Sequence, residues 1–341
     1  MRTLVIRFSA LGDLVLTLPA LGDLSACGGE VHFLTLDRFA SLLAPLPWIE
    51  RVWTLDAREG FAGLRRLAAE LRPVRFDAVL DLHDNLRSRG LRALLAGSVP
   101  RWIRSERDPL RRRLMVAAPD PFKSRLRARP YTPVVERHRE AALRLTGSPP
   151  ARERRYAVDP TTQAKVNERL AELGLAPTAR PLGLAPGAAW PQKAWPRFPE
   201  FITALPADLP LLLLGGPGEK DLCEEAAAAA KGPAAVLAGA RPLPELAAAL
   251  RRCRGLVSGD SGLAHLAEAC GRPVCVLFGP TVPEFGFAPR RPGSLLVQRE
   301  LSCRPCSLHG GRPCRFGDLR CLAGLEPEAL LEELAAEGWL G

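Results

Sequence analysis

The sequence predicts an α/β protein built from two Rossmann-like domains. Strand-like apolar runs alternate with amphipathic helix-like runs, and this alternation occurs twice along the chain. The 341 residues exceed the length at which a single core usually stops growing, and 47% of them are apolar, so we expect two cores. We place the domains at residues 1–160 and 161–341, joined through a proline- and arginine-rich stretch near 146–180.

The strand-like runs of the first half are short and are separated by helix-like segments such as residues 63–72. These runs cover residues 3–8, 31–36, 51–55 and 77–82. Such spacing is typical of a parallel sheet with helices on both faces. After the first run, we expect one helix that presents Leu14, Leu18 and Leu21 on one face.

The second half follows the same pattern, with runs at residues 181–186, 209–216, 234–239, 254–260 and 272–280. The fourth run ends in SGDSGLAHLAE (258–268), where a carboxylate, hydroxyls and glycines replace the apolar pattern. Ser261 can cap a helix there, and the amides of residues 261–263 can bind an anion. Because open sheets bind ligands at the carboxyl ends of their strands, this stretch predicts a phosphate or nucleotide site.

The net charge of +10 comes from one segment. Residues 101–155 contain 16 of the 47 Lys and Arg residues but only 6 of the 37 Asp and Glu residues. Within it, residues 101–129 are arginine-rich, and Pro109, Pro119, Pro121 and Pro130 indicate loops. Two interpretations stay open: a solvated basic surface, or a binding surface for a phosphorylated lipid, an acidic sugar, a membrane or a nucleic acid.

The apolar patterning favours a cytoplasmic protein. No apolar run approaches the ~20 residues of a membrane-spanning helix, and charges at Arg7 and Asp13 interrupt the only stretch that resembles a signal peptide. Nine scattered cysteines fit a reducing compartment. The turn after the first strand holds only Gly12, without the G-x-G-x-x-G pattern or a P-loop lysine, which disfavours a dehydrogenase or epimerase.

Three segments, in order, resemble the N-terminal, central and C-terminal motifs of glycosyltransferase family 9, the ADP-heptose:lipopolysaccharide heptosyltransferases. They are LVIRFSALGDLVLTLPAL (4–21), APGAAWPQKAWP (185–196) and SGDSGLAHLAEACGRPVCVLFGPT (258–281). The resemblance implies a GT-B fold, in which two Rossmann-like domains face each other across a cleft. The first would bind the acceptor and the second the nucleotide-sugar donor. It also implies inversion at the anomeric carbon with no obligatory cofactor.

The resemblance also assigns roles to individual residues. Asp13 matches the proposed general base, which takes the proton of the acceptor hydroxyl. The implied donor-binding residues are Lys193, Asp260, Ser261, Gly262, Leu263, His265 and Thr281. The candidate acceptor contacts are Ser9, Gly12, His83, Arg87 and Arg89.

Structural alternatives accompany several of these roles. A carboxylate such as Asp13 in a first helical turn stabilises the helix dipole, and Thr281 could cap a strand end. The chain also departs from the family pattern. Ala10 stands where a second serine is common, and His83 and Asp84 stand where a family motif has Gln-Gly. His83 is therefore either an acceptor contact or a structural hydrogen-bonding group.

Four cysteines form the pattern C-x2-C-x7-C-x6-C in a loop-rich stretch at 303–321. They are Cys303, Cys306, Cys314 and Cys321. Four thiolates at such spacing can hold a structural zinc ion, with His309 as a spare ligand. Reduced thiols or a facultative disulfide are the alternatives, because the second pair is too widely spaced for a standard zinc ribbon.

The sequence thus predicts an inverting glycosyltransferase that moves heptose, or a related sugar, from ADP-heptose to an anionic lipopolysaccharide-core-like acceptor. The expected partners are the nucleotide sugar and an anionic glycolipid or oligosaccharide, with peripheral contact at the inner membrane face. The alternative is a non-catalytic basic protein that binds nucleotides or nucleic acid. We do not expect nucleic-acid binding, because no known RNA or DNA module is present.

Overall fold

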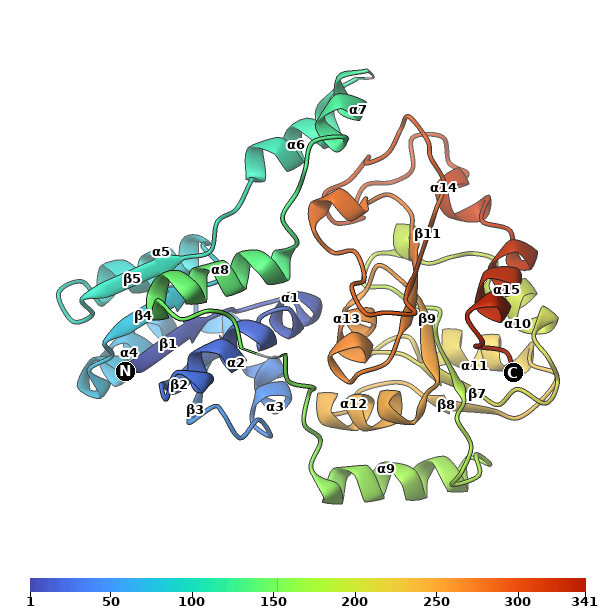
Figure 1. The fold of residues 1–341 in the computed structure, drawn as a ribbon, viewed down its shortest axis with the longest axis horizontal. Coiled ribbons are helices and arrows are strands. Elements are labelled where there is room, and N and C mark those ends of the chain that lie inside the picture. Colours follow the sequence, from blue (N-terminus) through green and yellow to red (C-terminus); the bar gives the residue numbers. More distant parts are fainter. Residues whose placement is uncertain (120, 152) are drawn as a thin grey trace. The chain divides into compact units, whose positions relative to one another are not determined.

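The structure, a computed structural model, describes residues 1–119, 121–151 and 153–341 and divides into two compact units (Figure 1). Unit 1 comprises Met1–Arg107 and Val134–Ala157, and unit 2 comprises Asp108–Pro133 and Val158–Gly341. The chain thus enters unit 2, returns to unit 1 and enters unit 2 again. A single boundary at residues 160 and 161 does not describe this path.

Unit 1 contains a five-stranded parallel sheet in the order β3-β2-β1-β4-β5. The strands are β1 (Arg2–Ile6), β2 (Glu30–Leu36), β3 (Arg51–Leu55), β4 (Ala78–Asp81) and β5 (Arg101–Arg104). The central strand places Val5 opposite Phe33 on one side and Leu80 on the other. The four predicted strands are confirmed. The sequence analysis did not predict the edge strand β5. Arginines occupy both of its ends and all four residues are at least partly exposed, so the strand has little apolar pattern.

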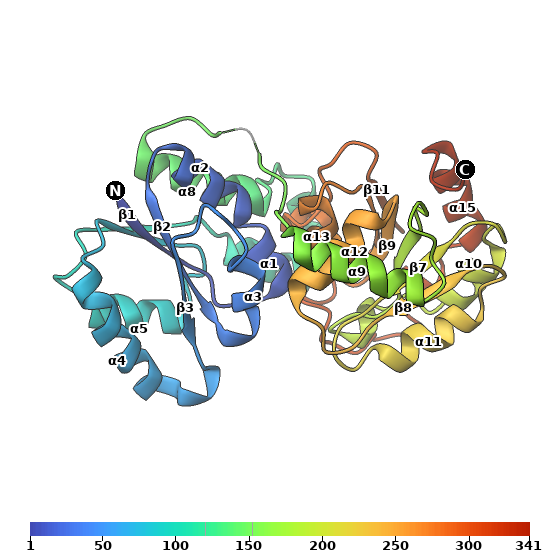
Figure 2. The same ribbon diagram turned by 90° about the horizontal axis from the view of Figure 1, so that it is seen from below.

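Helices cover both faces of this sheet (Figure 2). One face carries α2 (Leu18–Ala26) and α8 (Val134–Thr146), and the other carries α4 (Gly60–Leu71) and α5 (Leu86–Leu94). Two short helices, α1 (Leu11–Val15) and α3 (Ala40–Leu43), complete the unit. The expectation of one continuous helix after β1 is wrong. Pro19 cannot donate to the carbonyl of Val15 and its ring would clash there, so the helix ends and α2 begins with proline in its first turn.

Unit 2 contains a six-stranded parallel sheet in the order β11-β10-β9-β6-β7-β8. The strands are β6 (Leu182–Ala185), β7 (Leu211–Leu214), β8 (Ala234–Leu237), β9 (Gly255–Gly259), β10 (Val274–Phe278) and β11 (Leu295–Gln298). The inner strands are buried along their whole length, which explains their continuous apolar runs. All five predicted strands are confirmed, and the partly exposed edge strand β11 is additional.

Helices also cover the sheet of unit 2. One group consists of α9 (Pro160–Glu172), α12 (Leu243–Arg252) and α13 (Gly262–Ala269). The other consists of α10 (Phe198–Ala204), α11 (Lys220–Ala228) and α15 (Pro327–Ala336), and the short α14 (Arg320–Ala323) packs near β10. The predicted α/β class with two parallel sheets is therefore confirmed. Among the described residues, no helix has the length and apolar character needed to cross a membrane.

The arginine-rich segment forms two helices instead of loops, α6 (Pro109–Ala117) and α7 (Phe122–Arg127). Asp108 caps α6 by accepting the Arg111 N–H at 2.9 Å, and Pro109 occupies the first helical position, where proline is favoured. Met115 of α6 and Leu126 of α7 pack against Val282 and Phe285. This small apolar cluster attaches the segment to unit 2.

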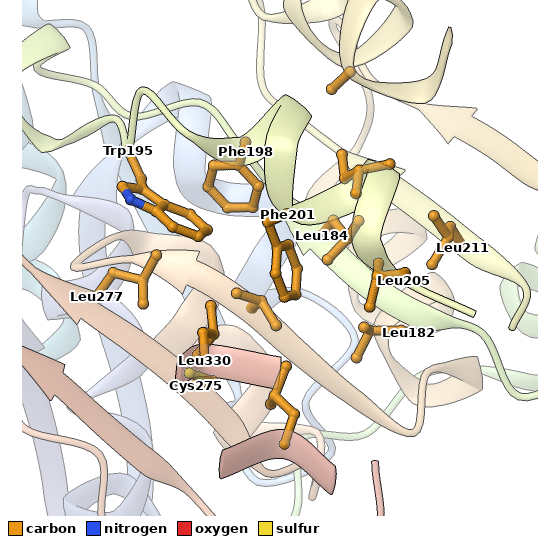
Figure 3. Packing of buried hydrophobic residues seen from close by; sticks show 14 of the residues in the cluster. Leu182, Leu184, Trp195, Phe198, Phe201, Leu205, Leu211, Cys275, Leu277 and Leu330 are labelled. Carbon is orange, nitrogen blue, oxygen red and sulfur yellow. The ribbon is translucent and has the colours of Figure 1, made fainter. Parts of the chain in front are cut away.

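The core of unit 2 surrounds three aromatic rings (Figure 3). Trp195, Phe198 and Phe201 pack with ring centroids 5.3 to 6.4 Å apart, beside leucines of the sheet. Trp195 is 2% exposed, whereas Trp190, five residues earlier, is 45% exposed. The buried tryptophan therefore anchors the end of the loop that follows β6.

We predict that Trp195→Ala lowers the free energy of unfolding by about 3–5 kcal/mol, because it opens a large cavity in this core. Trp190→Ala is the matched control and should lower the free energy of unfolding by clearly less, since its ring is 45% exposed and buries a smaller area. Denaturant titrations followed by circular dichroism would measure both. Equal losses in the two variants would contradict the different roles of the two tryptophans.

Candidate functional site

The sheet order reverses at one point in each unit. This point lies between β1 and β4 in unit 1 and between β6 and β9 in unit 2. Helices leave such strands toward opposite faces, so a crevice forms at the carboxyl ends of the strands, where open α/β sheets bind ligands. The residues expected to form the site follow these four strands or their neighbours, with Ser9, Gly12, Asp13 and His83 in unit 1 and Lys193, Asp260 and His265 in unit 2.

In unit 1, Asp13 forms an ion pair with Arg7. Asp13 is the third residue of α1, and its side chain is 25% exposed. Its Oδ2 lies 2.8 Å from Nη2 of Arg7 and accepts the Ala10 N–H at 3.4 Å. Burial disfavours ionisation, but Arg7 and this N–H together hold the pKa of the Asp13 carboxyl below its ordinary value. Asp13 is thus a carboxylate at neutral pH, and its Oδ1 accepts no hydrogen bond from a described side chain.

Arg7 itself joins the two loops of this crevice. Its side chain is almost fully buried and donates to the carbonyl of Ser9 at 2.9 Å and to that of Leu82 at 2.6 Å. These bonds fix the chain after β1 and after β4 while the third nitrogen contacts Asp13. The sequence analysis assigned no role to Arg7. A charged residue directly after an apolar strand is the signal that could have found it.

His83 acts as a hydrogen-bond acceptor in the fold. The Phe8 N–H donates to its Nδ1 at 3.0 Å. Because a backbone N–H can only donate, the ring proton resides on Nε2. Burial and the nearby Arg7 lower the pKa of His83 to about 3. The basic nitrogen is thus occupied, which agrees with the structural alternative for His83.

Asp84 explains one departure from the family motif. Its φ of 46° lies in the left-handed region, which glycine adopts freely and aspartate tolerates better than most residues. Its carboxylate pairs with Arg89 at 3.1 Å and with Arg104 at 3.4 Å. Of the two arginines proposed to contact the acceptor, Arg89 is therefore paired, while Arg87 is exposed and has no ion pair with a described residue.

Unit 2 places Lys193 against Asp260. The Nζ of Lys193 lies 2.6 Å from Oδ2 of Asp260, and their side chains are only 15% and 10% exposed. Thr281 donates to the same oxygen at 2.8 Å, so its hydroxyl serves Asp260 and does not cap the strand. Burial disfavours ionisation of Asp260, but the Lys193 ammonium outweighs it and lowers the pKa of the carboxyl. Three loops, after β6, β9 and β10, thus meet at one carboxylate.

The turn into α13 carries donor groups for an anion. A Cβ on Gly259 would lie 2.7 Å from the carbonyl oxygen of Lys193, so glycine permits this close approach of two loops. Ser261 caps α13 as expected, accepting the Ala264 N–H at 3.4 Å. The N–H groups of Gly262 and Leu263 lie in the first turn and have no acceptor within the helix. His265, in the next turn, is buried 6.0 Å from the Phe287 ring.

Glu219 is a further site candidate that the sequence analysis missed. It precedes α11, after β7, and accepts the Gly216 N–H at 2.5 Å. Its carboxylate also lies against Gly187 in the loop after β6, where a side chain would collide with it. In doubly wound folds, an acidic residue after the second strand binds ribose hydroxyls. Because β7 is the second strand of unit 2, Glu219 occupies the corresponding place.

The four clustered cysteines line one small cavity. All nine cysteines are free thiols. Burial raises the pKa of the Cys306 thiol, and it raises the pKa of the Cys321 thiol to about 11. Among the described residues, no three His, Cys, Asp or Glu side chains are arranged to hold a metal ion. The structure therefore does not show the expected zinc site.

Buried cations fix the cysteine-containing loop. Arg304 is 1% exposed and donates to the carbonyls of Gly279 at 2.5 Å and Thr281 at 2.9 Å. Lys123 of α7 donates to the carbonyl of Pro305 at 3.2 Å. The loop is thus tied to α7 and to the residues that follow β10, including Thr281 of the site.

Comparisons with known proteins agree with this geometry. Residues 64–312 match glycosyltransferase family 9 (heptosyltransferase). The chain is 29% identical over 336 residues to lipopolysaccharide heptosyltransferase 1 of Pseudomonas aeruginosa, covering 90% of this chain and 86% of that protein.

Solved structures show the same fold. ADP-heptose lipopolysaccharide heptosyltransferase II of Escherichia coli has a TM-score of 0.75 and 20% identity, covering 99% of this chain and 98% of that chain. Heptosyltransferase WaaC of Escherichia coli, solved with ADP, has a TM-score of 0.68 and 23% identity. This match covers 99% of this chain and 100% of that chain. The two parallel-sheet units are those of the GT-B class, and the chain is a glycosyltransferase that belongs to family 9, the heptosyltransferase family.

Proposed function

We propose that this enzyme transfers heptose from ADP-heptose to an anionic lipopolysaccharide-core acceptor, with inversion at the anomeric carbon. The observation that carries the proposal is the buried Lys193–Asp260 pair at the reversal point of unit 2, together with the start of α13 two residues after Asp260, where helical amides lack an intrahelical acceptor. The similarity to a lipopolysaccharide heptosyltransferase over most of the chain supports the choice of sugar and acceptor. The ADP-bound relative of the same fold supports the nucleotide.

In this proposal, unit 2 binds the donor. Lys193 and the amides of Gly262 and Leu263 hold the diphosphate, and Glu219 accepts hydrogen bonds from the ribose. Asp260, Ser261, His265 and Thr281 shape the remainder of the donor site. Asp260 keeps the lysine side chain in place before the donor binds. A fixed ammonium then stabilises the negative charge that develops on the leaving diphosphate.

Unit 1 supplies the base and binds the acceptor. Asp13 Oδ1 accepts the proton of the acceptor hydroxyl as its oxygen forms the bond to the anomeric carbon. The bond from that carbon to the phosphate oxygen breaks, and its electron pair leaves with ADP. Arg7 keeps Asp13 ionised until the acceptor arrives. We propose Ser9, Gly12, His83, Arg87 and Arg89 as acceptor contacts, with His83 donating from Nε2.

A lipid-linked acceptor would bring the enzyme to the cytoplasmic face of the inner membrane, which is the location we propose. Membership of a glycosyltransferase family disfavours the alternative of a non-catalytic nucleic-acid-binding protein.

We predict that Asp13→Asn lowers turnover by ~10²-fold or more while ADP-heptose affinity stays within about twofold, because only proton transfer is lost. Steady-state rates and a donor titration would measure this, and a melting curve would control for folding. A carboxylate that merely stabilises the helix dipole would be worth only about 0.3–1 kcal/mol. Normal turnover with a lowered melting temperature would therefore support the helix-dipole role.

We predict that Arg7→Gln moves the acid limb of the pH–rate profile to higher pH. The ionised form of Asp13 is the active one, so the rate falls as pH falls through its pKa. Without the Arg7 charge, the remaining burial raises that pKa. The profile of kcat/KM would be compared with that of the wild-type enzyme, and an unmoved acid limb would show that Arg7 does not control the base.

We predict that Lys193→Ala weakens ADP binding roughly 10- to 150-fold, because a charge-assisted hydrogen bond contributes about 1.5–3 kcal/mol. Lys193→Arg should restore only part of the lost ADP affinity, since a guanidinium group differs in shape from an ammonium group. Calorimetric titration with ADP would measure the affinities. The control is Lys220→Ala, an exposed lysine of unit 2 that pairs with Glu224 at 3.1 Å. Equal affinities of the Lys193→Ala, Lys220→Ala and wild-type enzymes would exclude the phosphate role.

A further inference from the structure

Unit 2 contains a second cavity, of about 450 Å³, that none of the roles above uses. Its walls come from α6, from Trp190 and from the loop that contains the cysteines. The residues that line it are Arg113, Val116, Ala117, Trp190, Ser307, Leu308, His309, Gly311 and Arg312. Among the described residues, no acidic side chain lines it, and the volume is within the range of small-ligand sites.

The two arginines of this cavity differ from their neighbours. Most basic side chains of the segment serve the fold: Arg111 donates to three backbone carbonyls, and Arg127 pairs with Glu284 and Glu300. By contrast, Arg113 and Arg312 are exposed and have no hydrogen bond or ion pair with a described residue. Two guanidinium groups that share one cavity in which no described carboxylate faces them favour an anionic ligand, because they offer planar pairs of donors for phosphate or carboxylate.

The tryptophan adds a flat apolar wall. Trp190 is 45% exposed, although the other tryptophan of its loop is buried in the core. A Cβ on Gly311 would lie 3.1 Å from the Trp190 ring, so glycine lets the loop backbone support this ring. Aromatic faces bury the apolar face of a sugar ring, while charged groups at the rim bind its substituents. The cavity thus combines the two features that a charged sugar requires.

The same two segments connect the cavity to the donor site. Trp190 directly precedes the short turn Pro191–Lys193. Gly310, next to Gly311, has a φ of 93° and lies against the aliphatic stem of Lys193, where a Cβ would be 2.9 Å from its Cγ. A ligand that contacts Trp190 and the residues beside Gly310 would therefore lie next to the lysine proposed to hold the donor phosphates.

We propose that this cavity binds a sugar residue that carries a phosphate or a carboxylate, with Arg113 and Arg312 on the anionic group and Trp190 against the ring. The assignment of this sugar to the acceptor rests on the proposed function. The cavity itself rests only on its own lining. Binding of the acceptor sugar in this cavity would make the donor-binding unit contribute to acceptor specificity.

The test uses the full-length enzyme and calorimetric titration in the presence of saturating ADP, which keeps the donor site occupied. The probes are glucose 6-phosphate, glucuronic acid, glucose and inorganic phosphate. We expect the two charged sugars to bind at least tenfold more tightly than glucose or phosphate alone. Arg113→Glu and Trp190→Ala should each weaken this binding at least tenfold and leave ADP affinity within twofold.

The matched control is Arg125→Glu, which makes the same charge change on an exposed arginine of α7 outside the cavity. It should leave binding of the charged sugars within twofold. Equal weakening by Arg125→Glu would overturn the proposal, because it would indicate attraction by net charge alone. Equal binding of glucose or of inorganic phosphate would overturn it as well. If the wild-type enzyme does not bind ADP, this result would count against the proposed function but not against the cavity.

Discussion

The ion pair between Lys193 and Asp260 is the interaction on which the loops at the reversal point of unit 2 depend. The two groups are nearly buried, so each requires the other: removing one partner of a buried pair typically costs 3–5 kcal/mol. Their contact brings together the loops after β6 and β9, and Thr281 adds the loop after β10 through the same carboxylate oxygen. Gly259 and Gly310 are required beside Lys193, because any side chain there would press on it.

Backbone carbonyls, more than acidic side chains, satisfy many of the arginines in this chain. Arg7 joins two loops of unit 1 in this way, and Arg304 joins two loops of unit 2. A buried guanidinium has five donors in a fixed plane, so it can tie several irregular segments that have no sheet or helix to satisfy them. Within the basic segment at residues 101–155, Arg111 also donates to three backbone carbonyls. Part of the basic excess is therefore structural, a third possibility beside the solvated surface and the anion-binding surface that the sequence suggested.

The cation–carboxylate pairs of the two units have different effects. In unit 1, Arg7 contacts one oxygen of Asp13, which keeps the carboxylate ionised and leaves its other oxygen without a hydrogen bond from a described side chain. In unit 2, Asp260 contacts Lys193, which orders an ammonium that a phosphate can approach. The protein thus fixes each charge before any substrate binds, and preorganised charges cost no reorganisation during the reaction.

The sequence by itself determined the fold class, the family and nine of the eleven strands in the described part of the chain. Buried parallel strands and glycine-containing turns leave recognisable patterns of neighbouring residues. The sequence also singled out Asp13, Lys193 and Ser261, each within a recognisable motif, and their roles stay predictions. The edge strands β5 and β11, the helices α6 and α7, and the partners of Arg7 and Arg304 were decided only by the tertiary structure. An edge strand gains its stability from the neighbouring strand, and a buried arginine gains its role from carbonyls that are distant in sequence. Neither leaves a local pattern along the chain.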